Sequence, residues 1–229
     1  MTPTEDGGQK VTTLDYRKEK RPMIRVLGIS VIRTLLFFFV LSVWSIPDWV
    51  DAQEQSVSLN AGGGVSIPVG DSSDGAATGW GLNAGFSVPI TANVHAFAEG
   101  YHSGLGIEDD LKAALTLIGA DAAISMTGAN IGILLKSNPS PVVMYARGGI
   151  GYGRATGVVS VLGLDVSITG SGFAFTLGTG IEIPVGETVS ITGDIRYNHI
   201  LGALENEYGF EDDPVQWIPI RVGVAFTPN

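Results

Sequence analysis

Two segments near the end of the chain alternate between large apolar side chains and small or polar ones. Residues 217–226 place large apolar side chains at every second position, at Ile218, Ile220, Val222, Val224 and Phe226. Residues 189–198 repeat this spacing with Val189, Ile191, Gly193, Ile195 and Tyr197. Side chains of a β-strand point alternately to opposite faces, so each segment has one apolar and one polar face. A transmembrane β-barrel provides these two surroundings, with lipid outside and a polar interior.

The same period of two recurs along the rest of the chain from residue 53 onward. It predicts eight strands, at 57–67, 79–88, 94–102, 125–136, 142–161, 166–183, 189–198 and 217–226. Three short connections, at 89–93, 137–141 and 184–188, contain proline, which favours turns and interrupts strand pairing. Longer loops alternate with these short turns, so both ends of the barrel chain are expected on the short-turn side.

The longer loops leave two points open. Residues 107–124 fit either a short helix or extensions of the flanking strands, and their apolar members are Leu111, Ala113, Ala114, Leu115, Leu117 and Ile118. Residues 162–165 are typical of a turn at the tip of a hairpin that rises beyond the membrane. Residues 199–216 form the last predicted loop, which is rich in acidic side chains.

The N-terminal region has the pattern of a secretory signal. Arg25 and Arg33 precede an apolar run at 34–46, and Ala52 provides the small residue expected before a cleavage site. We therefore divide the chain into an N-terminal extension with a signal peptide at 1–52 and a barrel at 53–229. The long polar stretch before Met23 indicates that the natural start is Met23, and a retained signal anchor is the alternative.

Composition and charge narrow the class of protein further. The chain has 229 residues, 32 glycines and no cysteine, with a mean hydropathy of +0.28. Without cysteine there are no disulfides, no thiolate catalysis and no cysteine-bound metal. Residues 53–229 contain 6 basic and 17 acidic residues, a net charge of −11. Nucleic acid is therefore not an expected partner.

The mature chain resembles the small eight-stranded outer-membrane barrels of the OmpA and OmpX type. The alternating segments, the short turns, the glycine-rich stretch 60–65 and the final strand ending at Phe226 carry this resemblance. It implies an all-β, antiparallel up-and-down transmembrane barrel in the outer membrane of a diderm bacterium, contacting membrane lipid as a monomer. It also implies recognition by the barrel-assembly machinery, although Thr227, Pro228 and Asn229 follow the terminal aromatic residue that is usual in the family.

The predicted interior contains seven ionisable side chains: Glu99, Lys136, Arg147, Glu182, Asp194, Arg196 and Arg221. An eight-stranded barrel has an interior that side chains can fill, so we expect these groups to form a connected ion-pair network. We place Arg196 and Arg221 with Asp194 at its centre, and Arg147 beside Glu99 or Glu182. Such a network is either a structural plug or a narrow gated path for ions.

The opposite face carries aromatic residues that we expect at the lipid interface. They are Trp80, Phe86, Tyr152, Phe173, Phe175, Tyr197, Trp217 and Phe226. Aromatic girdles of this kind border the apolar band of outer-membrane barrels.

The sequence predicts no catalytic residues, cofactor or metal. His102 and Ser103 are adjacent on a predicted strand, so they point to opposite faces and cannot act as base and nucleophile. His95 and His199 have no partner at ligand spacing. The acidic runs 108–110 and 211–213 lack the fixed ligand register of a calcium loop.

These patterns favour a non-enzymatic outer-membrane barrel with a filled interior and a structural or surface-interaction role through its acidic external loops. A narrow channel or transport barrel for ions or small solutes is the first alternative. A soluble lipocalin-type binder is the second, but it requires an apolar cavity and a polar exterior.

Overall fold

A computed structural model describes residues 56–73, 75–161, 164–201 and 214–228. The signal peptide expected at 1–52, its cleavage before Gln53 and the start at Met23 lie outside the described residues. Most of the acidic loop 199–216 also lies outside them. In the described part of the chain, no helix is long and apolar enough to cross a membrane.

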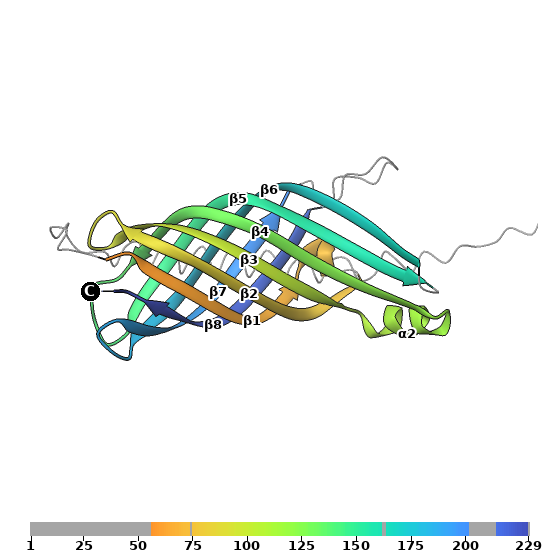
Figure 1. Cartoon of the computed structure of the whole chain (residues 1–229), viewed down its shortest axis with the longest axis horizontal. Helices are drawn as coiled ribbons and strands as arrows, with labels where there is room; N and C mark the ends of the chain where they lie inside the picture. The colour runs from red at the N-terminus through yellow and green to blue at the C-terminus, as the bar shows by residue number, and fades with distance from the viewer. Residues whose placement is uncertain (1–55, 74, 162–163, 202–213, 229) are drawn as a thin grey trace, which may run out of the picture.

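The described residues form a closed barrel of eight antiparallel strands in sequence order (Figure 1). The strands are β1 (Ser58–Pro68), β2 (Ala76–Pro89), β3 (Val94–Ile107), β4 (Ala120–Lys136), β5 (Val143–Val161), β6 (Leu164–Pro184), β7 (Val189–Ile200) and β8 (Val215–Phe226). The first strand pairs with the last, from Leu59 beside Phe226 to Pro68 beside Trp217. The predicted all-β, up-and-down eight-stranded barrel is therefore confirmed.

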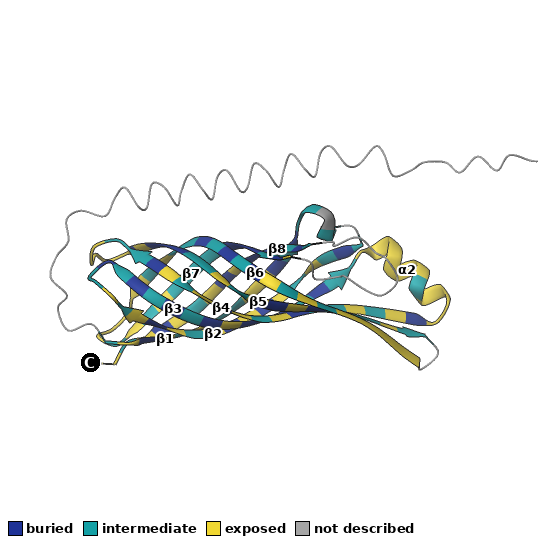
Figure 2. Cartoon of the chain, turned by 90° about the horizontal axis from the view of Figure 1, so that it is seen from above, coloured by how far each residue is buried: buried dark blue, intermediate teal, exposed yellow. Residues whose placement is uncertain are grey.

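Alternation along each strand separates an interior face from an outer face (Figure 2). On β3 the interior set is His95, Phe97, Glu99, Tyr101, Ser103 and Leu105, and all six are buried. Phe97 thus lies inside, on the same face as Glu99. Outer-face residues such as Leu82 and Val222 remain exposed. Because the period is two, one charged residue identifies the interior face of a whole strand.

The two strands on either side of residues 108–119 extend further than the periodicity alone predicts. β3 continues to Ile107 and β4 begins at Ala120, and the helix α2 (Asp109–Leu117) joins them. The helix and the strand extensions therefore both exist, in the segment where the sequence left them as alternatives. No residue of α2 is buried, and Leu117 is 89% exposed. α2 lies at the end of the barrel opposite the short turns and the C-terminus (Figure 1).

The barrel interior has two chemically different halves. Toward the α2 end, an apolar cluster fills it, composed of Ala76, Tyr101, Leu105, Met126, Ala155, Ala174, Ile200, Val215 and Trp217. Toward the short turns, the interior is lined with charged and hydroxyl side chains. The apolar half is buried, and the polar half contains the candidate site.

Candidate functional site in the barrel interior

Glu99, on β3, joins side chains from four other strands. Its Oε2 accepts hydrogen bonds from Asn83 Nδ2 at 2.9 Å and from Arg147 Nη1 at 3.2 Å. Its Oε1 accepts a hydrogen bond from Arg196 Nη1, and Arg221 Nη1 lies 3.7 Å from the same oxygen. All five side chains are buried. Glu99 is thus the anionic centre of a network that ties β2, β3, β5, β7 and β8 together.

Asp194 is the second anion of this network. It accepts hydrogen bonds of 2.7 Å from Arg196 Nε and from Arg196 Nη2, so the two groups form a bidentate pair. The Tyr145 hydroxyl donates to Asp194 Oδ2 at 3.3 Å. Paired hydrogen bonds of this kind fix a guanidinium in one plane. Arg196 is therefore held by both carboxylates at once.

Arg147 combines its bond to Glu99 with an aromatic contact. Its guanidinium carbon lies 3.9 Å from the centroid of the Phe97 ring, a distance typical of a cation–π interaction. A side chain at Gly149 would obstruct this ring, because an added Cβ would lie 2.8 Å from Phe97 Cζ. Glycine on β5 thus makes room for an interior aromatic residue that the network uses.

Lys136 and Glu182 form a separate pair nearer the short turns. Lys136 Nζ lies 2.7 Å from Glu182 Oε2, and both side chains retain some exposure. The structure therefore brings five of the seven predicted ionisable residues into one network and leaves these two as a pair. One detail differs from expectation: Glu99, rather than the group of Arg196, Arg221 and Asp194, is the centre. Of the two partners that the sequence left open for Arg147, the structure pairs it with Glu99.

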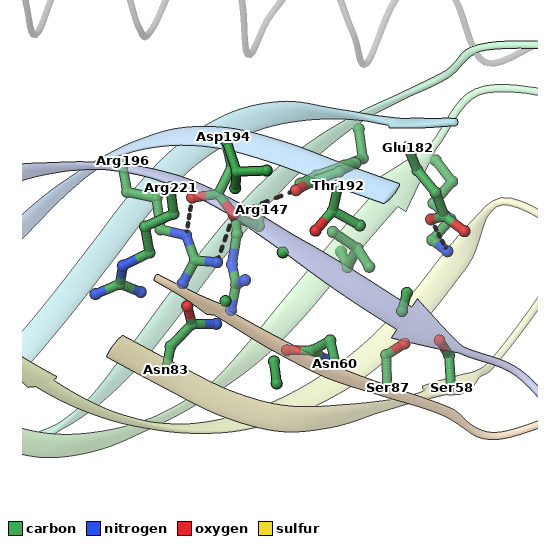
Figure 3. A pocket seen from close by; sticks show the side chains of 18 residues that line it. Ser58, Asn60, Asn83, Ser87, Arg147, Glu182, Thr192, Asp194, Arg196 and Arg221 are labelled. Carbon is green, nitrogen blue, oxygen red and sulfur yellow. Dashed lines mark hydrogen bonds and ion pairs between the residues drawn. The ribbon is translucent and has the colours of Figure 1, made fainter. Parts of the chain in front are cut away.

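A cavity of about 50 Å³ lies beside the network. Arg147, Arg196, Arg221, Asp194 and Asn83 lie at one end of it, and Ser58, Ser87 and Glu182 at the other (Figure 3). Ser58 and Ser87 are paired near the short-turn end of the barrel, so the cavity extends toward that end. This volume has room for about three to four water molecules.

Trp217 corrects one sequence expectation. It is 0% exposed and packs against Tyr101 inside the barrel, with ring centroids 5.7 Å apart. It therefore does not lie at a lipid interface. The alternation of β8 already carried the signal, because Trp217 has the same parity as Arg221 and the opposite parity to Ile220 and Val222. The size and aromatic character of Trp217 suggested the outer face. Its position in the alternation of the strand decides which face it occupies.

The other predicted interface aromatics lie on the outer face, with different exposure. Five of them, Trp80, Phe86, Tyr152, Phe173 and Phe226, are well exposed. Phe175 is partly covered, and Tyr197 is buried in a small outer cluster with Ile218 that Val69, Phe175 and Ile195 flank. The Tyr197 hydroxyl and His199 Nδ1 are 3.0 Å apart, which further orders this cluster.

The two residues considered for catalysis, His102 and Ser103, lie on opposite faces of the barrel wall. His102 is on the outer face, with its Nδ1 2.7 Å from Thr127 Oγ1, whereas Ser103 is buried inside and accepts a hydrogen bond from Ser66. Glu99 is engaged by the arginines. Among the described residues, no cluster of three or more His, Asp or Glu side chains could hold a metal ion.

Comparison with known proteins identifies the same architecture. Residues 36–226 match the model of the outer membrane protein beta-barrel domain family. Solved structures that are similar include Neisserial surface protein A, at 17% identity over 75% of this chain and 97% of that one, with a TM-score of 0.52. A major outer membrane protein from Thermus thermophilus is 15% identical over 76% and 99%, with a TM-score of 0.54.

The attachment invasion locus protein Ail of Yersinia pestis is also similar, at 17% identity over 76% of this chain and all of that one, with a TM-score of 0.50. At these identities the structural likeness concerns the fold. No curated protein matches the sequence significantly.

Proposed function

The chain belongs to the outer membrane protein beta-barrel domain family, and from this premise we propose that it is a non-enzymatic surface-interaction protein of the Gram-negative outer membrane. In this proposal the barrel is a closed support, and the external segments make the contacts. Function in such architectures resides in the loops that a rigid scaffold presents.

The observation that carries the proposal is the closed interior beside an exposed external helix. Trp217, Met126 and Ile200 have no exposed surface within the apolar cluster, which supports a filled interior at that layer over the ion-channel alternative. The outer face bears exposed apolar side chains and the interior bears charges, which is the reverse of a lipocalin. Discrete conductance steps in planar bilayers would support the channel instead.

The external segment α2 is the described part best placed for such contacts. None of its residues is buried, it begins with Asp109 and Asp110, and it displays Leu111 and Leu117 to solvent. A helix with this exposure contributes little to barrel packing. We propose that α2 contributes to the contact surface, as does the acidic loop that the sequence predicts at 199–216. Acidic side chains in such a surface favour cationic partners and strong salt dependence.

Exchange of residues 109–117 for a short Gly-Ser turn tests this role. We expect weaker adhesion to other cells or matrix proteins, because part of the contact surface is removed, while the heat-modifiable gel migration of the folded barrel is retained. The variant with the turn residues Val185–Glu187 changed to Gly-Ser is the matched control, since it alters the opposite end. Equal adhesion of both variants and the wild type would contradict the proposal.

Export and assembly complete the proposal. The basic and apolar pattern of residues 25–52 supports cleavage before Gln53, and the final strand supports recognition by the barrel-assembly machinery. Closure of the barrel within a single chain supports a monomer. The intact mass of protein taken from outer membranes tests the cleavage, because a mature form that begins before Gln53 would refute it.

A further inference from the structure

Arg221 is buried without adequate partners. It is 3% exposed, and none of its three side-chain nitrogens has a hydrogen-bond acceptor among the described residues. Its nearest anion, Glu99 Oε1, is 3.7 Å away, which is too far for a hydrogen bond. Arg147, 6% exposed, likewise has Nε and Nη2 without acceptors in the same part of the structure. Five donor nitrogens of two buried guanidiniums are thus unsatisfied.

The neighbouring carboxylates do not resolve this deficit. Asp194 is the cross-strand neighbour of Arg221, but it is bound in bidentate fashion by Arg196. Glu99 accepts from Asn83, Arg147 and Arg196. The network therefore has three guanidiniums for two carboxylates, and the Lys136–Glu182 pair is neutral by itself. A buried net positive charge costs several kcal/mol unless an anion approaches it.

The cavity offers such an anion a place next to these two arginine side chains. Both Arg147 and Arg221 line it, together with the hydroxyl and amide side chains of Thr192 and Asn60 (Figure 3). Its volume of about 50 Å³ suits a small polyatomic ion. A guanidinium donates two parallel hydrogen bonds, a geometry that matches the oxygens of an oxyanion better than a spherical halide.

From these contacts we infer that the barrel interior is a binding site for a small inorganic oxyanion, held by Arg147 and Arg221 and entered from the short-turn end. The ion completes the charge balance of the network and adds hydrogen bonds to otherwise unsatisfied donors. Because it binds the folded barrel and not the unfolded chain, it stabilises the barrel by mass action.

Urea unfolding of the full-length barrel in zwitterionic lipid bilayers tests the site, with sodium sulfate titrated against sodium chloride at matched ionic strength. Sulfate stabilises proteins in general through its exclusion from their surface, so the informative quantity is the difference between variants. We expect a saturable sulfate-dependent rise of the urea midpoint in the wild type. Arg221→Gln should weaken the apparent sulfate affinity by about tenfold or more, since a charge-assisted hydrogen-bond pair is lost.

Two further variants make the result decisive. Arg154→Gln removes an exposed arginine on the outer face of β5 and should keep the full sulfate response. Asn60→Asp adds a carboxylate to the cavity lining with little change of shape and should abolish the response, even if Arg221→Gln fails to fold. An equal, unsaturable response in the wild type, Asn60→Asp and Arg154→Gln would overturn the inference, because general exclusion alone would then explain it.

Discussion

Replacement of Glu99 by glutamine is expected to lower the free energy of unfolding of the barrel by about 3–5 kcal/mol. The carboxylate is buried and in contact with three guanidiniums from three strands. Glutamine keeps the shape and can keep a hydrogen bond, but it leaves Arg147, Arg196 and Arg221 with a single buried counter-charge. Urea unfolding in lipid bilayers, followed by tryptophan fluorescence, measures the change.

Glu187→Gln is the matched control for this substitution. Glu187 is exposed in the short turn between β6 and β7, so its neutralisation should change stability by no more than about 0.5 kcal/mol. A Glu99→Gln barrel as stable as the Glu187→Gln barrel would mean that water or mobile ions already screen the network. The proposed interior anion would then also lose its energetic basis.

Trp217→Ala is expected to destabilise the barrel by about 3–5 kcal/mol, the range measured for large aromatic residues truncated in cores. Trp217 has no exposed surface and lies against Tyr101 in the apolar layer, so truncation leaves a cavity that strands of a closed barrel cannot easily collapse around. The difference in the free energy of unfolding between this variant and the wild type is measured in bilayers with the same urea protocol.

Trp80→Ala provides the comparison within one residue type. Trp80 is 52% exposed on the outer face of β2 and packs beside His102. Its truncation leaves no internal cavity, so a loss of less than half that of Trp217→Ala is expected. Equal losses would place both tryptophans in similar surroundings and contradict the interior position of Trp217.

Alternation predicted the strands and their faces because the side chains of a strand repeat every two residues. In a sheet whose two sides face unlike surroundings, a side chain on the wrong face is costly. It located Glu99, Arg147, Arg196 and Arg221 inside from sequence alone. It did not locate the partners of each charge, since pairing depends on register and side-chain reach between strands. Asn83 illustrates this limit: its parity places it inside, but only the β2–β3 register brings its amide to Glu99.

The ends of the strands were harder to predict for a different reason. Residues 103–107 and 120–124 lie where the barrel wall extends toward α2, and small residues such as Gly104, Gly106 and Ala122 weaken the apolar signal there. Glycine and alanine have little hydropathy contrast, so periodicity cannot separate an extended strand from a loop. Main-chain pairing between β4 and β5, from Ala120 beside Val161, makes these residues strands.

The pairing of β1 with β8 also constrains the order of biogenesis. Until Val215–Phe226 has been synthesised and delivered, β1 and β7 each expose a row of unpaired amide and carbonyl groups, which invites pairing between molecules. A nascent or truncated chain that ends before residue 215 therefore carries two adhesive edges. Such a chain is expected to pair with other copies through these edges and to aggregate more readily than the complete barrel.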